Sequence, residues 1–144
     1  MSIYFKTHEF DCHDGTPYPM AWVGDRLAAL CSQLDPIREA LALPLKVVSG
    51  YRTLSYNTSI VGAKLSQHVE GKAADIQPIC PLEQRAAEVE RSHQLVLTMI
   101  GNAGLPLVGG LGYYPGKWIH VDIRDKVNGH VTRWVGAGIG SEVS

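Results

Sequence analysis

Apolar residues recur every three or four positions along two long stretches of the chain, and this spacing predicts two helices. In residues 22–43 the repeating apolar positions are Leu27, Leu30, Cys31, Leu34, Ile37 and Leu41. Pro36 interrupts this stretch, so it forms either one kinked helix or two helices, the second of which Asp35 would cap. The second stretch, residues 81–103, starts with Pro81, a residue that the first turn of a helix tolerates.

Four shorter segments are rich in β-branched residues or alternate between apolar and polar positions, which predicts strands. They are residues 45–49, 107–114, 117–124 and 130–135. Pro115 and Gly116 separate the middle two segments, so we expect these to pair as a hairpin. Thr53 is expected to cap a short helix that ends before Gly62. Together the elements predict an α+β fold, in which a small, mainly antiparallel sheet carries the functional site and packs against two longer helices.

The length of 144 residues fits a single domain, residues 1–144, with a core large enough to fold without disulfides. Residues 1–20 are expected to form an irregular arm, because Pro17 and Pro19 cannot continue a helix or a central strand. The glycine-rich residues 136–144 are expected to form a mobile tail. We expect the domain to be a monomer.

Charge and hydropathy exclude several classes of partner. The formal net charge is −1 and no basic stripe is present, which argues against nucleic acid. No run of eighteen apolar residues is present, which argues against membrane insertion, and the first residues lack the pattern of a secretory signal. We therefore expect a cytoplasmic protein. The three cysteines, Cys12, Cys31 and Cys80, form no Cys-x-x-Cys pair and are expected to be free thiols.

Two segments place imidazole and carboxylate groups where they could meet. In residues 66–75, His68 and Asp75 are separated by small residues that include Gly71, which lets the chain fold back tightly. In residues 118–122, the strand-like alternation directs His120 and Asp122 to the same face. Two histidines and one aspartate are ligand types of a catalytic zinc site, which keeps one position for water.

These residues resemble the LAS-type zinc peptidases of bacterial cell walls, which include D-alanyl-D-alanine carboxypeptidases and phage L-alanyl-D-glutamate endopeptidases. The pattern of that family is Ser-x-His-x-x-Gly-x-Ala-x-Asp, with a late His on a strand and an upstream Ser-Gly-Tyr-Arg. Residues 66–75, His120 and residues 49–52 match these three parts in turn. The resemblance runs from about residue 10 to about residue 124. It is closest to small, phage-type, single-domain members, in which an N-terminal Glu-Phe is followed by Cys, as in residues 9–12.

The resemblance implies that His68, Asp75 and His120 are zinc ligands and that Arg52 binds or polarises a substrate oxygen. From their positions in the sequence, two further residues are candidate substrate contacts. They are Ser66, which could instead support the ligand or simply form a turn, and Tyr113, which together with Tyr114 could form a wall of the substrate pocket.

The general base does not follow from the resemblance. Many family members carry Glu three residues before the last His, where this chain has Lys117, and others carry His two residues before it, where this chain has Trp118. Asp122 is our candidate base, because it shares a strand face with His120. The alternative role for Asp122 is to accept a hydrogen bond from a ligand imidazole and orient it.

The resemblance implies a Zn²⁺ peptidase that hydrolyses the peptide stem of bacterial peptidoglycan by means of a zinc-activated water. An endolysin-like endopeptidase for the bond between L-Ala and D-Glu fits best, and a holin would release such a cytoplasmic enzyme to the cell wall. A D-Ala-D-Ala carboxypeptidase or endopeptidase of the same family is an alternative. Because Lys117 replaces the usual Glu, an inactive zinc-containing module that binds the cell wall is a further alternative.

Overall fold

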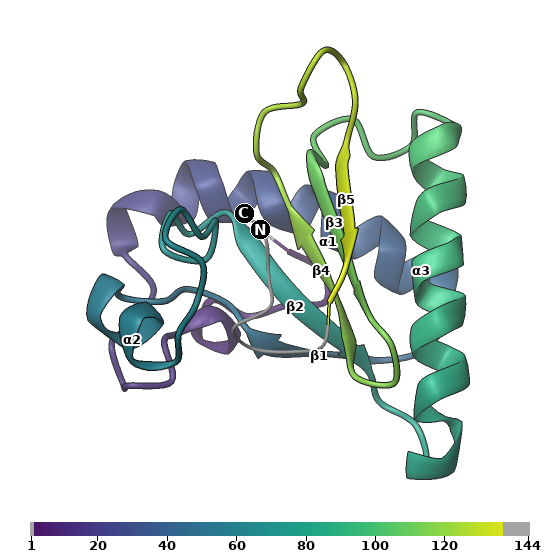
Figure 1. Cartoon of the computed structure of the whole chain (residues 1–144), viewed down its shortest axis with the longest axis horizontal. Helices are drawn as coiled ribbons and strands as arrows, with labels where there is room; N and C mark the ends of the chain where they lie inside the picture. The colour runs from purple at the N-terminus through teal and green to yellow at the C-terminus, as the bar shows by residue number, and fades with distance from the viewer. Residues whose placement is uncertain (1, 137–144) are drawn as a thin grey trace.

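The computed structural model of the protein describes residues 2–136 and is built around one five-stranded sheet (Figure 1). The strands are β1 (Leu45–Ser49), β2 (Ala73–Pro78), β3 (Gly110–Tyr114), β4 (Trp118–Asp122) and β5 (Thr132–Val135). The helices are α1 (Ala28–Leu41), α2 (Leu54–Ser59) and α3 (Arg85–Gly101). The strand order is β1-β2-β4-β3-β5, and only the β3–β5 pair is parallel. The predicted α+β fold, with a mainly antiparallel sheet and two longer helices, is confirmed.

The register of the sheet decides which residues share a face. His120 of β4 lies opposite Asp75 of β2 on one side and opposite Gly112 of β3 on the other. Gly112 in turn lies opposite Trp134 of β5. Because residues that face each other across a ladder point to the same side, these four positions form one row across one face of the sheet.

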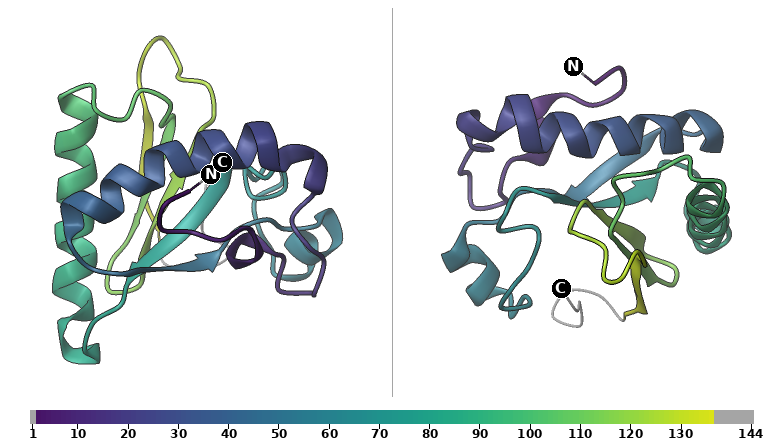
Figure 2. Two further views of the ribbon diagram at one scale, coloured as in Figure 1. Left: turned by 180° about the vertical axis from the view of Figure 1, so that it is seen from behind. Right: turned by 90° about the horizontal axis from the view of Figure 1, so that it is seen from above.

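The two longer helices cover the other face. Figure 1 shows α1 behind the sheet and α3 beside it, and Figure 2 shows the same arrangement from above. The buried side chains packed between these layers are Leu30, Leu34 and Ile37 of α1, Val89 and Val96 of α3, and Ile76, Leu111, Ile119 and Val121 of the sheet. Since neighbouring residues of a strand point to opposite faces, burial of Ile119 and Val121 against the helices sends His120 and Asp122 to the other side.

α1 continues through Pro36 as one helix, so the alternative of two helices is not what forms. Asp35 does not act as a cap. Its carboxylate instead accepts hydrogen bonds from the hydroxyl of Ser2 at 2.6 Å and from the backbone N–H of Ile3 at 3.1 Å. The N-terminal arm is thereby tied to α1, and Phe5 and Phe10 of the arm are buried in the core.

The short helix α2 and the β3–β4 hairpin form where the local sequence predicts them. The hydroxyl of Thr53 accepts a hydrogen bond from the backbone N–H of Tyr56, which confirms Thr53 as the cap of α2. β3 and β4 form the expected hairpin across Pro115 and Gly116. Apart from Gly136, the tail expected at residues 136–144 lies outside the described residues. None of the helices within residues 2–136 is long and apolar enough to cross a membrane.

Candidate metal centre

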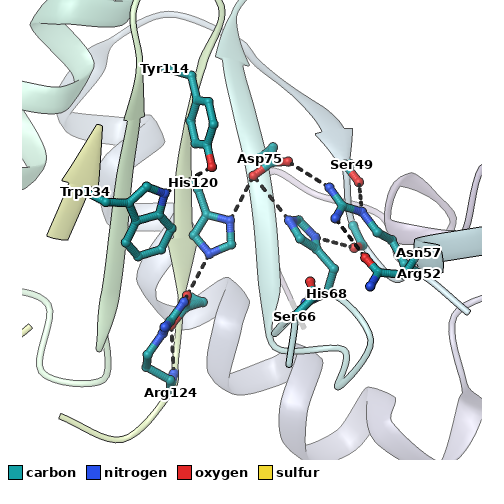
Figure 3. A network of polar contacts seen from close by, with 12 residues as sticks. Ser49, Arg52, Asn57, Ser66, His68, Asp75, Tyr114, His120, Arg124 and Trp134 are labelled. Atoms are coloured by element: carbon teal, nitrogen blue, oxygen red, sulfur yellow. Dashed lines mark hydrogen bonds and ion pairs between the residues drawn. The ribbon is translucent and has the colours of Figure 1, made fainter. Parts of the chain in front are cut away.

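His68, Asp75 and His120 come together on the face of the sheet opposite α1 and α3 (Figure 3). Asp75 and His120 are cross-strand partners on β2 and β4, and His68 lies in the turn that leads into β2. One ligand atom from each residue lies within 4.8 Å of the others, and all three side chains are buried. The seven-residue spacing of His68 and Asp75 therefore does bring both side chains to one point.

Hydrogen bonds fix which nitrogen each imidazole directs to the cluster. Nδ1 of His68 lies 2.7 Å from the carbonyl oxygen of Gly50, which can only accept, so Nδ1 carries the proton and Nε2 faces Asp75. Nε2 of His120 lies 2.7 Å from Oδ2 of Asp122, and its Nδ1 faces Asp75. Each ring thus presents one nitrogen lone pair to the same place, which is the arrangement that a metal requires.

The distances between these donors suit zinc. Oδ1 of Asp75 lies 3.3 Å from Nε2 of His68 and 3.0 Å from Nδ1 of His120. In a tetrahedral zinc site with bonds of 2.0–2.1 Å, neighbouring ligand atoms are about 3.3 Å apart. Two neutral imidazoles and one carboxylate also leave the fourth position that a catalytic site needs. The donor set and its spacing therefore fit Zn²⁺.

The charges around Asp75 favour its ionised form, which is the form that binds a metal. Burial alone would raise the pKa of Asp75, but in the metal-free protein the adjoining imidazoles of His68 and His120, when protonated, outweigh burial and hold that pKa well below its ordinary value. The guanidinium of Arg52 is also close, with Nη2 3.5 Å from Oδ2 of Asp75. The carboxylate is therefore charged at neutral pH.

Arg52 is buried and held on several sides. Its Nε donates to the hydroxyl of Ser49 and its Nη1 donates to the side-chain oxygen of Asn57, each at 3.2 Å. The backbone N–H of Arg52 donates to the carbonyl oxygen of His68. The strand-end arginine predicted from the sequence thus lies beside the cluster. Asn57 belongs to no motif in the sequence, so its contact with Arg52 cannot be predicted from the sequence.

Ser66 supports the turn that carries His68. Its side chain is buried, and its hydroxyl accepts a hydrogen bond from the backbone N–H of His68 at 3.2 Å. Gly71 closes the same turn with a φ of +70°, and its carbonyl oxygen accepts a hydrogen bond from the hydroxyl of Tyr18 at 2.6 Å. A Cβ at Gly71 would lie 2.7 Å from the ring of Trp22. The small residues between the ligands therefore serve both the backbone conformation and the packing.

Tyr113 lies on the opposite face of the sheet from the cluster. Its ring stacks on His93 of α3, with 4.5 Å between the ring centroids and an angle of 10° between the planes. Its neighbour Tyr114 is the tyrosine of β3 that points to the side of the cluster, where its hydroxyl accepts a hydrogen bond from Nε1 of Trp134 at 3.0 Å. The placement of Tyr113 gives no support to a substrate contact.

Asp122 lies behind His120, on the side of the ring that faces away from Asp75. Both its oxygens are engaged: Oδ2 by Nε2 of His120 and Oδ1 by the backbone N–H of Arg124 at 3.0 Å, with the guanidinium of Arg124 contacting both. Burial alone would raise the pKa of Asp122, but the hydrogen bonds from His120 and Arg124 hold it well below its ordinary value. This geometry supports the orienting role for Asp122 over the role of base. Lys117 is exposed at the tip of the hairpin.

Residues 4–122 of the chain match the Peptidase M15 family. This match covers most of the chain and includes Arg52 and all three residues of the cluster, so the chain belongs to the Peptidase M15 family. Peptidases of this family depend on zinc and act on substrates of the peptidoglycan type, which confirms the resemblance seen in the sequence and identifies the chain as a zinc peptidase. Among curated proteins, none matches the chain.

Proposed function

We propose that the chain is an endolysin-like endopeptidase that hydrolyses the bond between L-Ala and D-Glu in the peptide stem of bacterial peptidoglycan. The observation that carries the proposal is the buried His68–Asp75–His120 cluster in a chain of a zinc-peptidase family. The choice of bond is supported by the likeness of residues 9–12 to the N-terminal segment of small phage-type endopeptidases.

Each residue of the site has its own role in the proposed reaction. His68, Asp75 and His120 hold the metal, with the tautomer of each imidazole set by its second hydrogen bond. Bound zinc would polarise the scissile carbonyl and lower the pKa of a water molecule to about 7, so that no strong base is needed at neutral pH. Arg52 places a positive charge beside the cluster, where it stabilises the negative charge that develops on the substrate oxygen.

The test is digestion of purified peptidoglycan by the zinc-loaded protein, followed by mass spectrometry of the fragments. The proposed activity leaves muramic acid with L-Ala alone and creates a new D-Glu N-terminus. Loss of terminal D-Ala only would assign the protein to the carboxypeptidases, and cleavage at D-Ala cross-links would assign it to the endopeptidases of that group. His120→Ala should release no fragments, whereas His130→Ala, which removes an exposed histidine outside the cluster, should cleave as the wild type does.

An inactive wall-binding module is the second candidate, favoured by Lys117 at the position where many relatives carry the general base. For such a module the zinc-loaded protein would sediment with intact sacculi and release no new amino groups from them. Delivery to the wall through a holin and a monomeric state stay predictions.

A further inference from the structure

The guanidinium of Arg124 forms hydrogen bonds to both carboxylate oxygens of Asp122. The guanidinium Nε of Arg124 lies 2.9 Å from Oδ1 and 3.0 Å from Oδ2 of Asp122, and Nη2 donates to Oδ2 as well. Asp122 is fully buried, and the Arg124 side chain is 12% exposed. A buried carboxylate held in this way by a guanidinium has little freedom to rotate, so it offers His120 an acceptor in one fixed place.

Trp134 completes the support from the neighbouring strand β5. Its ring centroid lies 5.0 Å from that of His120, and the guanidinium carbon of Arg124 lies 5.0 Å from the centroid of the Trp134 ring. The indole N–H donates to the hydroxyl of Tyr114 at 3.0 Å, which fixes the plane of the indole (Figure 3). The imidazole of His120 therefore has the indole against its side and Asp122 at its far nitrogen.

Two glycines of β3 provide the space for this support. A Cβ at Gly112 would lie 2.6–2.9 Å from atoms of the Trp134 indole. A Cβ at Gly110 would lie 2.6 Å from Nε of Arg124 and would also collide with the carboxylate of Asp122. Gly110 and Gly112 therefore admit the side chains that pack around His120.

We propose that Arg124 and Trp134 are positioning residues that set the affinity of the site for zinc. Arg124 holds Asp122, and Asp122 and the Trp134 indole together fix the orientation of the His120 imidazole. The inference rests on the zinc site of the proposed function and goes beyond it. Both residues lie outside the matched segment, residues 4–122, so the family match does not carry their role. The site is accordingly completed by the parallel strand β5, although all three ligand residues precede that strand.

The test measures zinc affinity by competition with a chromophoric chelator, for the wild type and for Arg124→Ala and Trp134→Ala. Loss of a group that orients a metal ligand typically weakens metal binding about 10–100-fold, and we expect a loss in this range for both variants. Arg133→Ala is the matched control, because it removes the same charge from an exposed position next to Trp134. We expect the control to bind zinc within about 2-fold of the wild type.

Three measurements separate positioning from a general loss of structure. Arg124→Lys keeps the charge and one donor, so it should recover part of the affinity that Arg124→Ala loses, and Trp134→Phe should do the same for Trp134→Ala. The absorption bands of the cobalt-substituted protein report ligand geometry for each bound ion, so they should change in the alanine variants and not in Arg133→Ala. Urea unfolding of the metal-free proteins records whether each variant folds.

Wild-type zinc affinity and unchanged cobalt bands in folded Arg124→Ala and Trp134→Ala would overturn the inference. If the alanine variants do not fold, the zinc affinities of Arg124→Lys and Trp134→Phe test the inference instead. An unchanged zinc affinity in both of these variants would also overturn the inference. If the proposed function were wrong but this inference correct, the wild type would cleave no peptidoglycan, while the zinc affinities of the variants would still fall.

Discussion

Arg52 donates a hydrogen bond from Nη1 to the side-chain oxygen of Asn57 at 3.2 Å, and Asn57 is in turn hydrogen-bonded to the loop before the metal-binding turn. The amide nitrogen of Asn57 donates to the carbonyl oxygen of Ala63 at 2.8 Å. Gly62 has no side chain in the space that the Asn57 amide occupies, because a Cβ there would collide with it. One buried amide therefore joins the arginine beside the cluster to the segment that leads into Ser66 and His68.

Asn57→Ala is expected to lower both stability and turnover. The substitution removes the hydrogen bonds of Asn57 to Arg52 and to the carbonyl oxygen of Ala63, which costs about 1–3 kcal/mol of unfolding free energy. The turnover number should fall more than the Michaelis constant changes, because Arg52 acts on charge that develops during the reaction. Urea unfolding and kinetics on a soluble stem peptide measure the two effects. Asn102→Ala, at the exposed C-terminal end of α3, is the control and should change neither value.

Gly71→Ala should destabilise the protein more than Gly116→Ala does. Both glycines have positive φ, +70° and +76°, so both substitutions incur a backbone cost of about 1–2 kcal/mol. At Gly116 a Cβ meets open space, whereas at Gly71 it meets Trp22 and Tyr18, which adds about 1–3 kcal/mol for overpacking. Thermal unfolding of both metal-free variants measures the difference. Equal losses at the two positions would contradict the packing described around Gly71.

Removal of zinc should lower the melting temperature and abolish hydrolysis. A ligand that binds only the folded state stabilises it by about 2.7 kcal/mol when present at one hundred times its dissociation constant. Calorimetry with and without a chelator should therefore show a clear shift for the wild type. The melting temperature of His120→Ala should respond far less to the chelator, and an equal response would show that zinc stabilises the fold from another site.

Asp14 should make the stability of the N-terminal arm depend on pH. Hydrogen bonds from the backbone and side chain of Thr16, followed by those from Cys12 and Thr53, lower the pKa of Asp14 to about 2. Because the folded pKa is below the unfolded value of 3.8, the contribution of Asp14 is complete above that value. It is lost as the pH falls from there towards about 2.

The measurement for Asp14 compares the melting temperatures of metal-free wild type and Asp14→Asn over this range of pH. The gap between them should be constant near neutral pH and should narrow as the pH falls below about 4. Asp125→Asn, which removes an exposed carboxylate after β4, is the control. A gap that stays constant down to the lowest pH would show that the charge of Asp14 plays no part.

Local signals in the sequence predicted the parts of the fold that depend on neighbouring residues. The apolar repeat of α1, the cap at Thr53 and the hairpin at Gly116 each follow from residues a few positions apart. The sequence alone does not decide whether Pro36 divides the helix, because the answer depends on whether packing against the core holds the helix together. In the structure Leu34 and Ile37, on either side of the proline, are both fully buried in the core.

The site also combines features that the local sequence predicts with features that depend on tertiary packing. The spacing of His68 and Asp75 and the strand position of His120 made the cluster predictable from sequence. The contacts that surround it could not be predicted, because Asn57 and Trp134 reach the site through tertiary packing. Tyr113 illustrates the limit well: a shift of one residue along a strand moves a side chain to the other face, and Tyr114 is the tyrosine that faces the cluster.

The strand order also restricts how a peptide substrate can lie. β2 and β4, which carry Asp75 and His120, are interior strands with a neighbour on each side, and the edges of the sheet are β1 and β5. A substrate peptide therefore cannot reach the ligands by adding itself as a further strand beside them. A peptide must instead approach from the side of the sheet opposite α1 and α3, so recognition of the substrate depends on the side chains and loops on that side.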